Sequence, residues 1–251
     1  MIRRVIVRTG CRVGCFRQAD SVVAVCTRCG WVTVVLLSGS RRGFVVVDVL
    51  EMATAERTDM AGFLANLTPE QWVAQSLCAH WRVRDVVAHV MSFDGVNLLG
   101  MVRRAVRGRI VHINQVGVDE LASLSTEQLL DRLQARLRPQ GLAASFGGRL
   151  ALLDVTIHHQ GIRRPLGLLR QIPAERLRQV LDGVVCSPEL PGRRIARGVR
   201  LVATDLEWSH GSGPEVRGPA EAVLMAVAGR ASAVGELVGP GQPRVAGRIA
   251  H

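Results

Sequence analysis

The amino-acid sequence predicts an all-α helical bundle followed by a small α+β domain. Apolar residues recur at helical spacing from about residue 53 to residue 182, and capping signals divide this region into several helices. Beyond residue 182 the pattern changes to a β-type run, a glycine-containing turn and another helix. With 251 residues, 48% of them hydrophobic, the chain is long enough for one large or two modest domains with a buried core.

The first 51 residues differ in composition from the rest. Residues 11–29 hold four of the six cysteines, as one Cys-x3-Cys pair and one Cys-x2-Cys pair. These pairs could form a zinc knuckle, although the gap between them is shorter than in common four-cysteine sites. The alternatives are a poorly ordered extension, or translated upstream sequence before a natural start at Met52. We predict that residues 1–51 are an atypical, disordered or non-native extension.

Capping signals define the helices of the first predicted domain, residues 52–182. Thr68, Pro69 and Gln71 form a capping box with proline at the first helical position. A helix over 81–93 follows, with His89 at the edge of its apolar stripe. The remaining predicted helices cover 98–107, 110–122, 126–137 after an N-cap at Ser125, 150–160, and 173–181 beginning near Pro173, with a loop over 141–148.

The second predicted domain, residues 183–251, mixes strand and helix. Residues 198–208 have the pattern of a strand, 210–213 that of a turn, and 215–217 that of a returning strand. Helices over 219–228 and 231–237 follow, before an end rich in glycine and proline.

Composition excludes several classes of protein. The net charge of +11 comes from 32 basic residues that are all arginine, but they are scattered without a run of five, so we predict no binding to nucleic acid. No stretch of 18 uninterrupted apolar residues predicts a transmembrane helix, and the basic N-terminus lacks the continuous apolar segment of a signal peptide. We predict a cytoplasmic protein with no membrane partner. Arginine, alanine, valine and glycine dominate the composition, which suggests a GC-rich, actinobacterial gene.

Two candidate metal ligands, Asp154 and His158, lie four residues apart in the predicted helix over 150–160. At about 100° per residue they share one face, whereas His159 points away from Asp154. His89, on another helix of the bundle, is the candidate third ligand. Imidazole and carboxylate together suit zinc, iron, nickel or cobalt. Three protein ligands leave a position open for water or a thiol.

Several motifs together resemble the mycothiol-dependent maleylpyruvate isomerase family of DinB/YfiT-like metalloenzymes. They are Leu-Thr-Pro-Glu-Gln-Trp at 67–72, Ser-Leu-Cys at 76–78, and Trp-Arg-Val-Arg-Asp-Val-Val-Ala-His at 81–89. Asp-Val-Thr-Ile-His at 154–158, followed by Ile-Arg-Arg-Pro-Leu-Gly at 162–167, resembles the second metal segment. Residues 198–208, 218–221 and 229–230 resemble the C-terminal domain.

This resemblance implies a four-helix bundle that holds a divalent metal, zinc by expectation, through His89, Asp154 and His158. It implies mycothiol as the thiol cofactor and a small-molecule substrate, with isomerase or S-transferase activity; the chain is expected to be a monomer or homodimer. Arg230 is our candidate for contact with a substrate carboxylate, although a cation near a helix end is an equally good reading.

Arg163 and Arg164 are the candidates for binding mycothiol. The chain departs from the family pattern at Asp154, where glutamate is common, at Gly161, where aspartate is usual, and at His80, where glycine commonly precedes the tryptophan. A non-catalytic metal-binding or regulatory module on the same scaffold is the alternative function.

Overall fold

The computed structural model describes residues 13–18, 21–26, 32–35, 48–96, 98–108, 112–187 and 190–250. The chain divides into two compact units, Met1–Val46 and Val47–His251. In the first unit, strands β1 (Val13–Gln18), β2 (Ser21–Cys26) and β3 (Val32–Val35) form an antiparallel sheet in the order β1-β2-β3. Cys11 and Cys29, two of the four cysteines considered for a zinc knuckle, lie outside the described residues.

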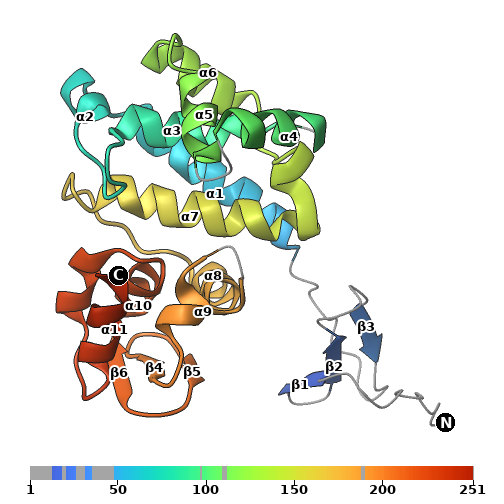
Figure 1. The fold of residues 1–251 in the computed structure, drawn as a ribbon, viewed down its shortest axis with the longest axis vertical. Coiled ribbons are helices and arrows are strands. Elements are labelled where there is room, and N and C mark those ends of the chain that lie inside the picture. Colours follow the sequence, from blue (N-terminus) through green and yellow to red (C-terminus); the bar gives the residue numbers. More distant parts are fainter. Residues whose placement is uncertain are drawn as a thin grey trace. The chain divides into compact units, whose positions relative to one another are not determined.

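The second unit is mostly helical and carries a small three-stranded sheet near its C-terminus (Figure 1). Its α-helices are α1 (Val49–Leu64), α2 (Pro69–Val73), α3 (Val83–Ser92), α4 (Leu98–Arg107), α5 (Ile113–Asp119), α6 (Thr126–Gln134), α7 (Arg149–Arg163), α8 (Ala174–Cys186), α9 (Gly192–Ile195), α10 (Ala220–Val227) and α11 (Gln242–Ile249). Two 3₁₀ helices, η1 (Gly141–Gly148) and η2 (Ala231–Glu236), complete the set.

Two predicted helix starts are found as capping boxes. The Thr68 hydroxyl accepts a hydrogen bond from the Gln71 backbone N–H, and the Gln71 side chain accepts one from the Thr68 N–H. Ser125 begins α6 in the same way. Helix α1 begins at Val49, because the carboxylate of Asp48 accepts from the N–H two residues on. Residue 52, the predicted start of the first domain, therefore lies within this helix.

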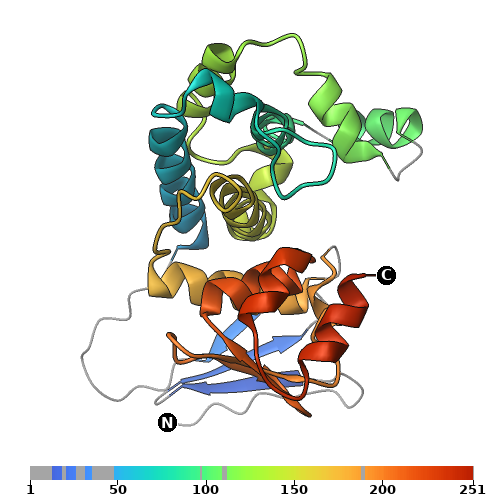
Figure 2. The ribbon, with the colours of Figure 1, turned by 90° about the vertical axis from the view of Figure 1, so that its left-hand side faces the viewer.

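Helix α7 is the central element of the second unit. It packs against α1 and α3, and α6 also packs against both, so the contacts link four helices in a closed cycle (Figures 1 and 2). Met60, Leu64, Val87, Leu129 and Leu133 are among the fully buried side chains of this core. Almost every residue of α7 from position 151 to 162 is buried, because its opposite side packs on α8 and α10. This environment fixes the direction of each α7 side chain.

The C-terminal sheet has the strand order β5-β4-β6, with β4 at Arg200–Ala203, β5 at Ser209–Gly211 and β6 at Glu215–Gly218. Strand β4 pairs antiparallel with β5 and parallel with β6. The strand predicted over 198–208 is thus shorter, and ends at Ala203, because a turn follows in which the Ala203 N–H donates to the Trp208 carbonyl at 3.0 Å. The first two residues of the turn predicted over 210–213 belong instead to strand β5.

Three further elements differ from the sequence-based prediction. The loop over 141–148 is the 3₁₀ helix η1, and helices α9 and α11 lie in segments for which no helix is predicted. Helix α8 continues to Cys186, across the predicted domain boundary at 182. That subdivision of residues 52–251 stays a prediction. Within the part of the chain that the structure describes, no helix is long and apolar enough to cross a membrane.

Candidate metal centre

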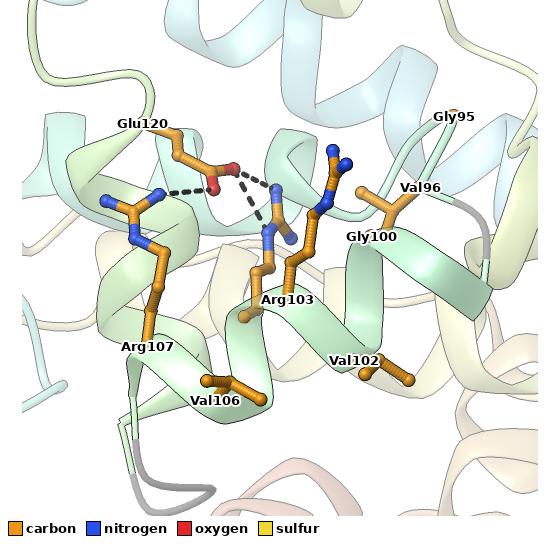
Figure 3. Close-up of a pocket in the computed structure, with 9 residues that line it drawn as sticks. Gly95, Val96, Gly100, Val102, Arg103, Val106, Arg107 and Glu120 are labelled. Atoms are coloured by element: carbon orange, nitrogen blue, oxygen red, sulfur yellow. Dashed lines mark hydrogen bonds and ion pairs between the residues drawn. The ribbon is translucent and has the colours of Figure 1, made fainter.

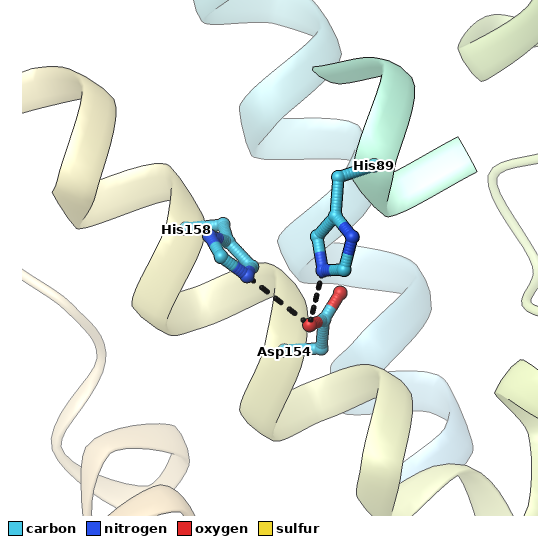
Figure 4. A group of neighbouring side chains, drawn as sticks. All are labelled: His89, Asp154 and His158. Carbon is cyan, nitrogen blue, oxygen red and sulfur yellow. Dashed lines mark hydrogen bonds and ion pairs between the residues drawn. The ribbon is translucent and has the colours of Figure 1, made fainter. Parts of the chain in front are cut away.

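His89, Asp154 and His158 come together between α3 and α7, as the sequence predicts for a shared ion. Their candidate ligand atoms all lie within 4.8 Å of one another. Figure 4 shows both imidazole rings directed at one carboxylate: Nε2 of His89 and Nε2 of His158 each lie 3.3 Å from Oδ1 of Asp154. Two imidazole nitrogens and a carboxylate oxygen at this separation fit the donor set of a zinc-type ion.

Burial and aromatic packing hold the two imidazoles in place. His89 is 3% exposed and His158 is 9% exposed. The Trp81 ring centroid lies 4.8 Å from that of His89, and Phe93 meets the same imidazole edge-on at 5.5 Å. Asp154 is only half-buried, with 36% of its side chain exposed, so the centre opens to solvent on the carboxylate side.

The electrostatics of the three groups favour one shared positive charge. Burial opposes ionisation of Asp154, but the two histidines outweigh it and keep the pKa of this carboxyl well below its usual range. Burial likewise opposes a charged His158, yet the Asp154 carboxylate raises the pKa of that imidazole to about 9. Burial lowers the pKa of His89 despite the same carboxylate. The protonated His158 therefore balances the negative charge of Asp154. A metal ion bound by the same residues would supply that positive charge instead.

Cys78 was not predicted as a site residue, although the structure places it beside the centre. Its Sγ lies 3.4 Å from Nδ1 of His158. The Arg230 guanidinium donates to the same sulfur, with Nη2 at 3.3 Å. Burial opposes the thiolate form, but the contacts with His158 and Arg230 lower the pKa of Cys78 below its ordinary value. The Ser-Leu-Cys segment was visible in the sequence, but nothing in its spacing relates it to His158.

Arg230 belongs to the C-terminal part of the chain, where it directly precedes η2. Its contact with Cys78 therefore brings a C-terminal side chain next to a candidate ligand of α7. The Nε atom of Arg230 is buried and has no hydrogen-bond partner among the described residues. A guanidinium with an unused donor suits a carboxylate ligand. The role of Arg230 in catalysis stays a prediction.

Arg163 and Arg164, the candidates for binding mycothiol, already have partners within the protein. Arg163 donates to Nε2 of His159 at 2.8 Å and lies over the Phe63 ring, 3.8 Å from its centroid. Arg164 forms ion pairs with Glu221, on α10, and with Glu236, on η2. The two arginines fasten α7 to its neighbours, and their part in cofactor binding stays a prediction.

His159 faces away from the candidate metal ligands. Its Nδ1 lies 2.9 Å from Oε1 of Glu56, and both side chains are fully buried. Arg170 and Arg176 also form ion pairs with Glu56. Burial opposes the Glu56 charge, but His159 and the nearby arginine lower the pKa of this carboxyl to about 2. This cluster joins α1, α7 and α8.

A surface pocket of about 590 Å³ lies on α4 and is lined by none of the three candidate ligands. Val102 and Val106 contribute apolar walls, while Arg104 and Arg107 pair with Glu120 beside it (Figure 3). Glu120 pairs with two of the lining arginines, Arg104 and Arg107, and none of the three candidate ligands reaches this pocket. The convergent side chains between α3 and α7 are the better candidate site.

Comparison with known proteins identifies related sequences and structures. Residues 53–163 match the family described as the mycothiol maleylpyruvate isomerase N-terminal domain. Two solved structures are similar: the mycothiol-dependent maleylpyruvate isomerase, with a TM-score of 0.46, and a histidine-to-alanine mutant of that enzyme, with a TM-score of 0.47. Each shares 12% sequence identity over 76% of this chain and 91% of the other. No curated protein matches the chain.

Proposed function

We propose that this protein is a metal- and mycothiol-dependent enzyme, because residues 53–163 match the family described as the mycothiol maleylpyruvate isomerase N-terminal domain. It acts on a small electrophilic substrate, as an isomerase or as an S-transferase. The reacting groups assemble between α3 and α7. The cycle of α1, α3, α6 and α7 is, in this proposal, the family's four-helix bundle.

The convergence of two imidazole nitrogens on one carboxylate oxygen carries the proposal. His89, Asp154 and His158 would hold a divalent ion, zinc by the chemistry of the donors. When bound, such an ion favours the deprotonated form of an external thiol and so supplies a nucleophile at neutral pH. The half-exposed Asp154 leaves one side of the centre accessible to that thiol.

Arg230 supports a substrate that carries a carboxylate. Its guanidinium is held near the centre by Cys78, and its Nε donor has no partner among the described residues. A carboxylate placed there would be oriented next to the thiol by a charge-assisted hydrogen bond. Trp81 packs against His89 and so limits the space on that side of the site.

Metal analysis of purified variants tests the ligand set. We expect about one zinc per chain in the wild type and a loss of most of it in His89→Ala and in His158→Ala. His159→Ala is the matched control, because that imidazole faces Glu56, and it should keep its metal. Full occupancy in both ligand variants would overturn the proposed site.

The cofactor is tested on the cobalt-substituted protein. Mycothiol should produce a sulfur-to-cobalt charge-transfer band in the wild type and none in His89→Ala. Arg230→Ala should keep the band, because Arg230 acts on the substrate in this proposal, and should lose turnover of carboxylate substrates. A metal-loaded protein that shows no band at millimolar thiol would instead be a non-catalytic metal-binding module.

A further inference from the structure

We propose that Cys78 is a positioning residue, whose sulfur orients both the candidate metal ligand His158 and the candidate substrate contact Arg230. This inference rests on the proposed metal site and adds a residue outside the three ligands. Cys78 contacts one nitrogen of His158 and one of Arg230, and it is only 6% exposed.

The loop between α2 and α3 places the sulfur accurately. The Leu77 backbone N–H donates to the carbonyl of Gly161 on α7 at 2.9 Å, which fastens the loop to the helix that carries His158. The hydroxyl of Ser76 accepts from the Cys78 N–H at 3.0 Å, and the Gln75 amide donates to the Cys78 carbonyl at 3.0 Å. Both backbone groups of Cys78 are therefore held, and its side chain has little freedom.

The position of the sulfur matches what a metal-bound imidazole needs. Nε2 of His158 faces Asp154, at 3.3 Å, and Nδ1 on the other side of the ring faces Cys78. A histidine that uses Nε2 as a ligand carries its proton on Nδ1 and donates it to a neighbour, which fixes the ring orientation. That neighbour is commonly a carboxylate or a carbonyl oxygen; here it is the sulfur of Cys78.

His89 lacks a comparable support. Its Nδ1 is buried and has no hydrogen-bond partner among the described residues. Of the two imidazole ligands, only His158 is thus oriented through its second nitrogen. The loss of the Cys78 sulfur should therefore loosen the better fixed of the two histidines.

Arg230 makes the second contact of the same sulfur. Its Nη2 donates to Sγ at 3.3 Å, while its Nε has no partner in the described part of the chain. Cys78 is therefore the side chain that joins α7 to the C-terminal guanidinium. If the sulfur is removed, Arg230 loses the contact that holds it near His158.

Cobalt titration of three single variants tests this role in the full-length protein. Cys78→Ala should weaken cobalt binding about 10- to 100-fold and alter the visible cobalt spectrum. Cys78→Ser keeps an acceptor at the same position and should recover most of the affinity. Cys186→Ser removes the exposed cysteine of α8 and should match the wild type.

Thermal unfolding of the metal-free proteins separates positioning from folding. If Cys78→Ala does not fold, Cys78→Val takes its place and must show the same loss of affinity. Wild-type affinity and spectrum in a folded Ala or Val variant, or no recovery in Cys78→Ser, would overturn the positioning role and leave the proposed function intact. A wild type that binds no cobalt would overturn both.

Discussion

Replacing His80 by glycine is expected to stabilise the protein. His80 has a φ angle of 68°, in the left-handed region that disfavours residues with a Cβ atom, and its side chain is exposed. A non-glycine residue in this conformation costs about 1–2 kcal/mol. Glycine removes that cost but loses about 0.5–1 kcal/mol of chain entropy on folding. The difference between the midpoints of these two ranges predicts a net gain of about 0.75 kcal/mol in the free energy of unfolding.

Thermal unfolding of the metal-free protein measures this effect. For a folded unit of this size, about 1 kcal/mol raises the Tm by about 2–4 °C. His112→Gly is the matched control, because His112 is also exposed but has a φ angle of −111°, so there is no strain to relieve. Because His112 is the N-cap residue of α5, where glycine is well tolerated, that variant should not be more stable than the wild type by more than a few tenths of a kcal/mol. A His80→Gly variant that is no more stable than the wild type, while His112→Gly behaves as expected, would refute the reasoning.

Three further predictions concern buried positions. Gly161→Ala should stabilise α7 by about 1 kcal/mol in chemical unfolding, because the new Cβ would meet only the Leu77 Cβ at 4.0 Å. Gly183→Ala in α8 should instead destabilise, since its Cβ would lie 2.6 Å from Leu153 Cδ2; equal effects would contradict this account. The Glu56 carboxyl has a pKa of about 2 in the folded protein against 4.5 in the unfolded chain, so its contribution is complete above pH 4.5 and is lost as the pH falls toward 2. The free energy of unfolding, measured with urea, should therefore fall by about 3 kcal/mol over this pH range. Glu56→Gln should be less stable than the wild type at neutral pH and should lack this pH dependence.

Local signals in the sequence were sufficient to predict many of the helices in the second unit. Thr68 and Ser125 mark the starts of their helices because each forms a capping box, which depends only on two residues three positions apart. Asp154 and His158 share a face for the same local reason, since four residues make about one turn. Helical geometry also predicts that His158 and His159 point in different directions. In the structure His158 contacts Asp154, whereas His159 contacts Glu56.

Other features depend on contacts between distant segments. Cys78 lies 80 residues before His158 and 152 before Arg230, so no spacing rule relates the three. Strand β4 ends at Ala203, where the next N–H, that of Thr204, donates to the carbonyl of Gly218 on β6, although the sequence pattern continues to Trp208. Helix α11 lies in a segment rich in glycine and proline, whose composition favours a loop.

The reach of Arg230 to Cys78 has a consequence for how proteins of this kind diversify. The three candidate ligands are encoded within residues 53–163, whereas Arg230 is encoded downstream of that segment. Recombination that exchanged only the downstream part of the gene would change the candidate substrate contact and keep the candidate metal ligands. Under the proposed function, paralogues that arose in this way would share one metal centre and differ in the compounds that they accept.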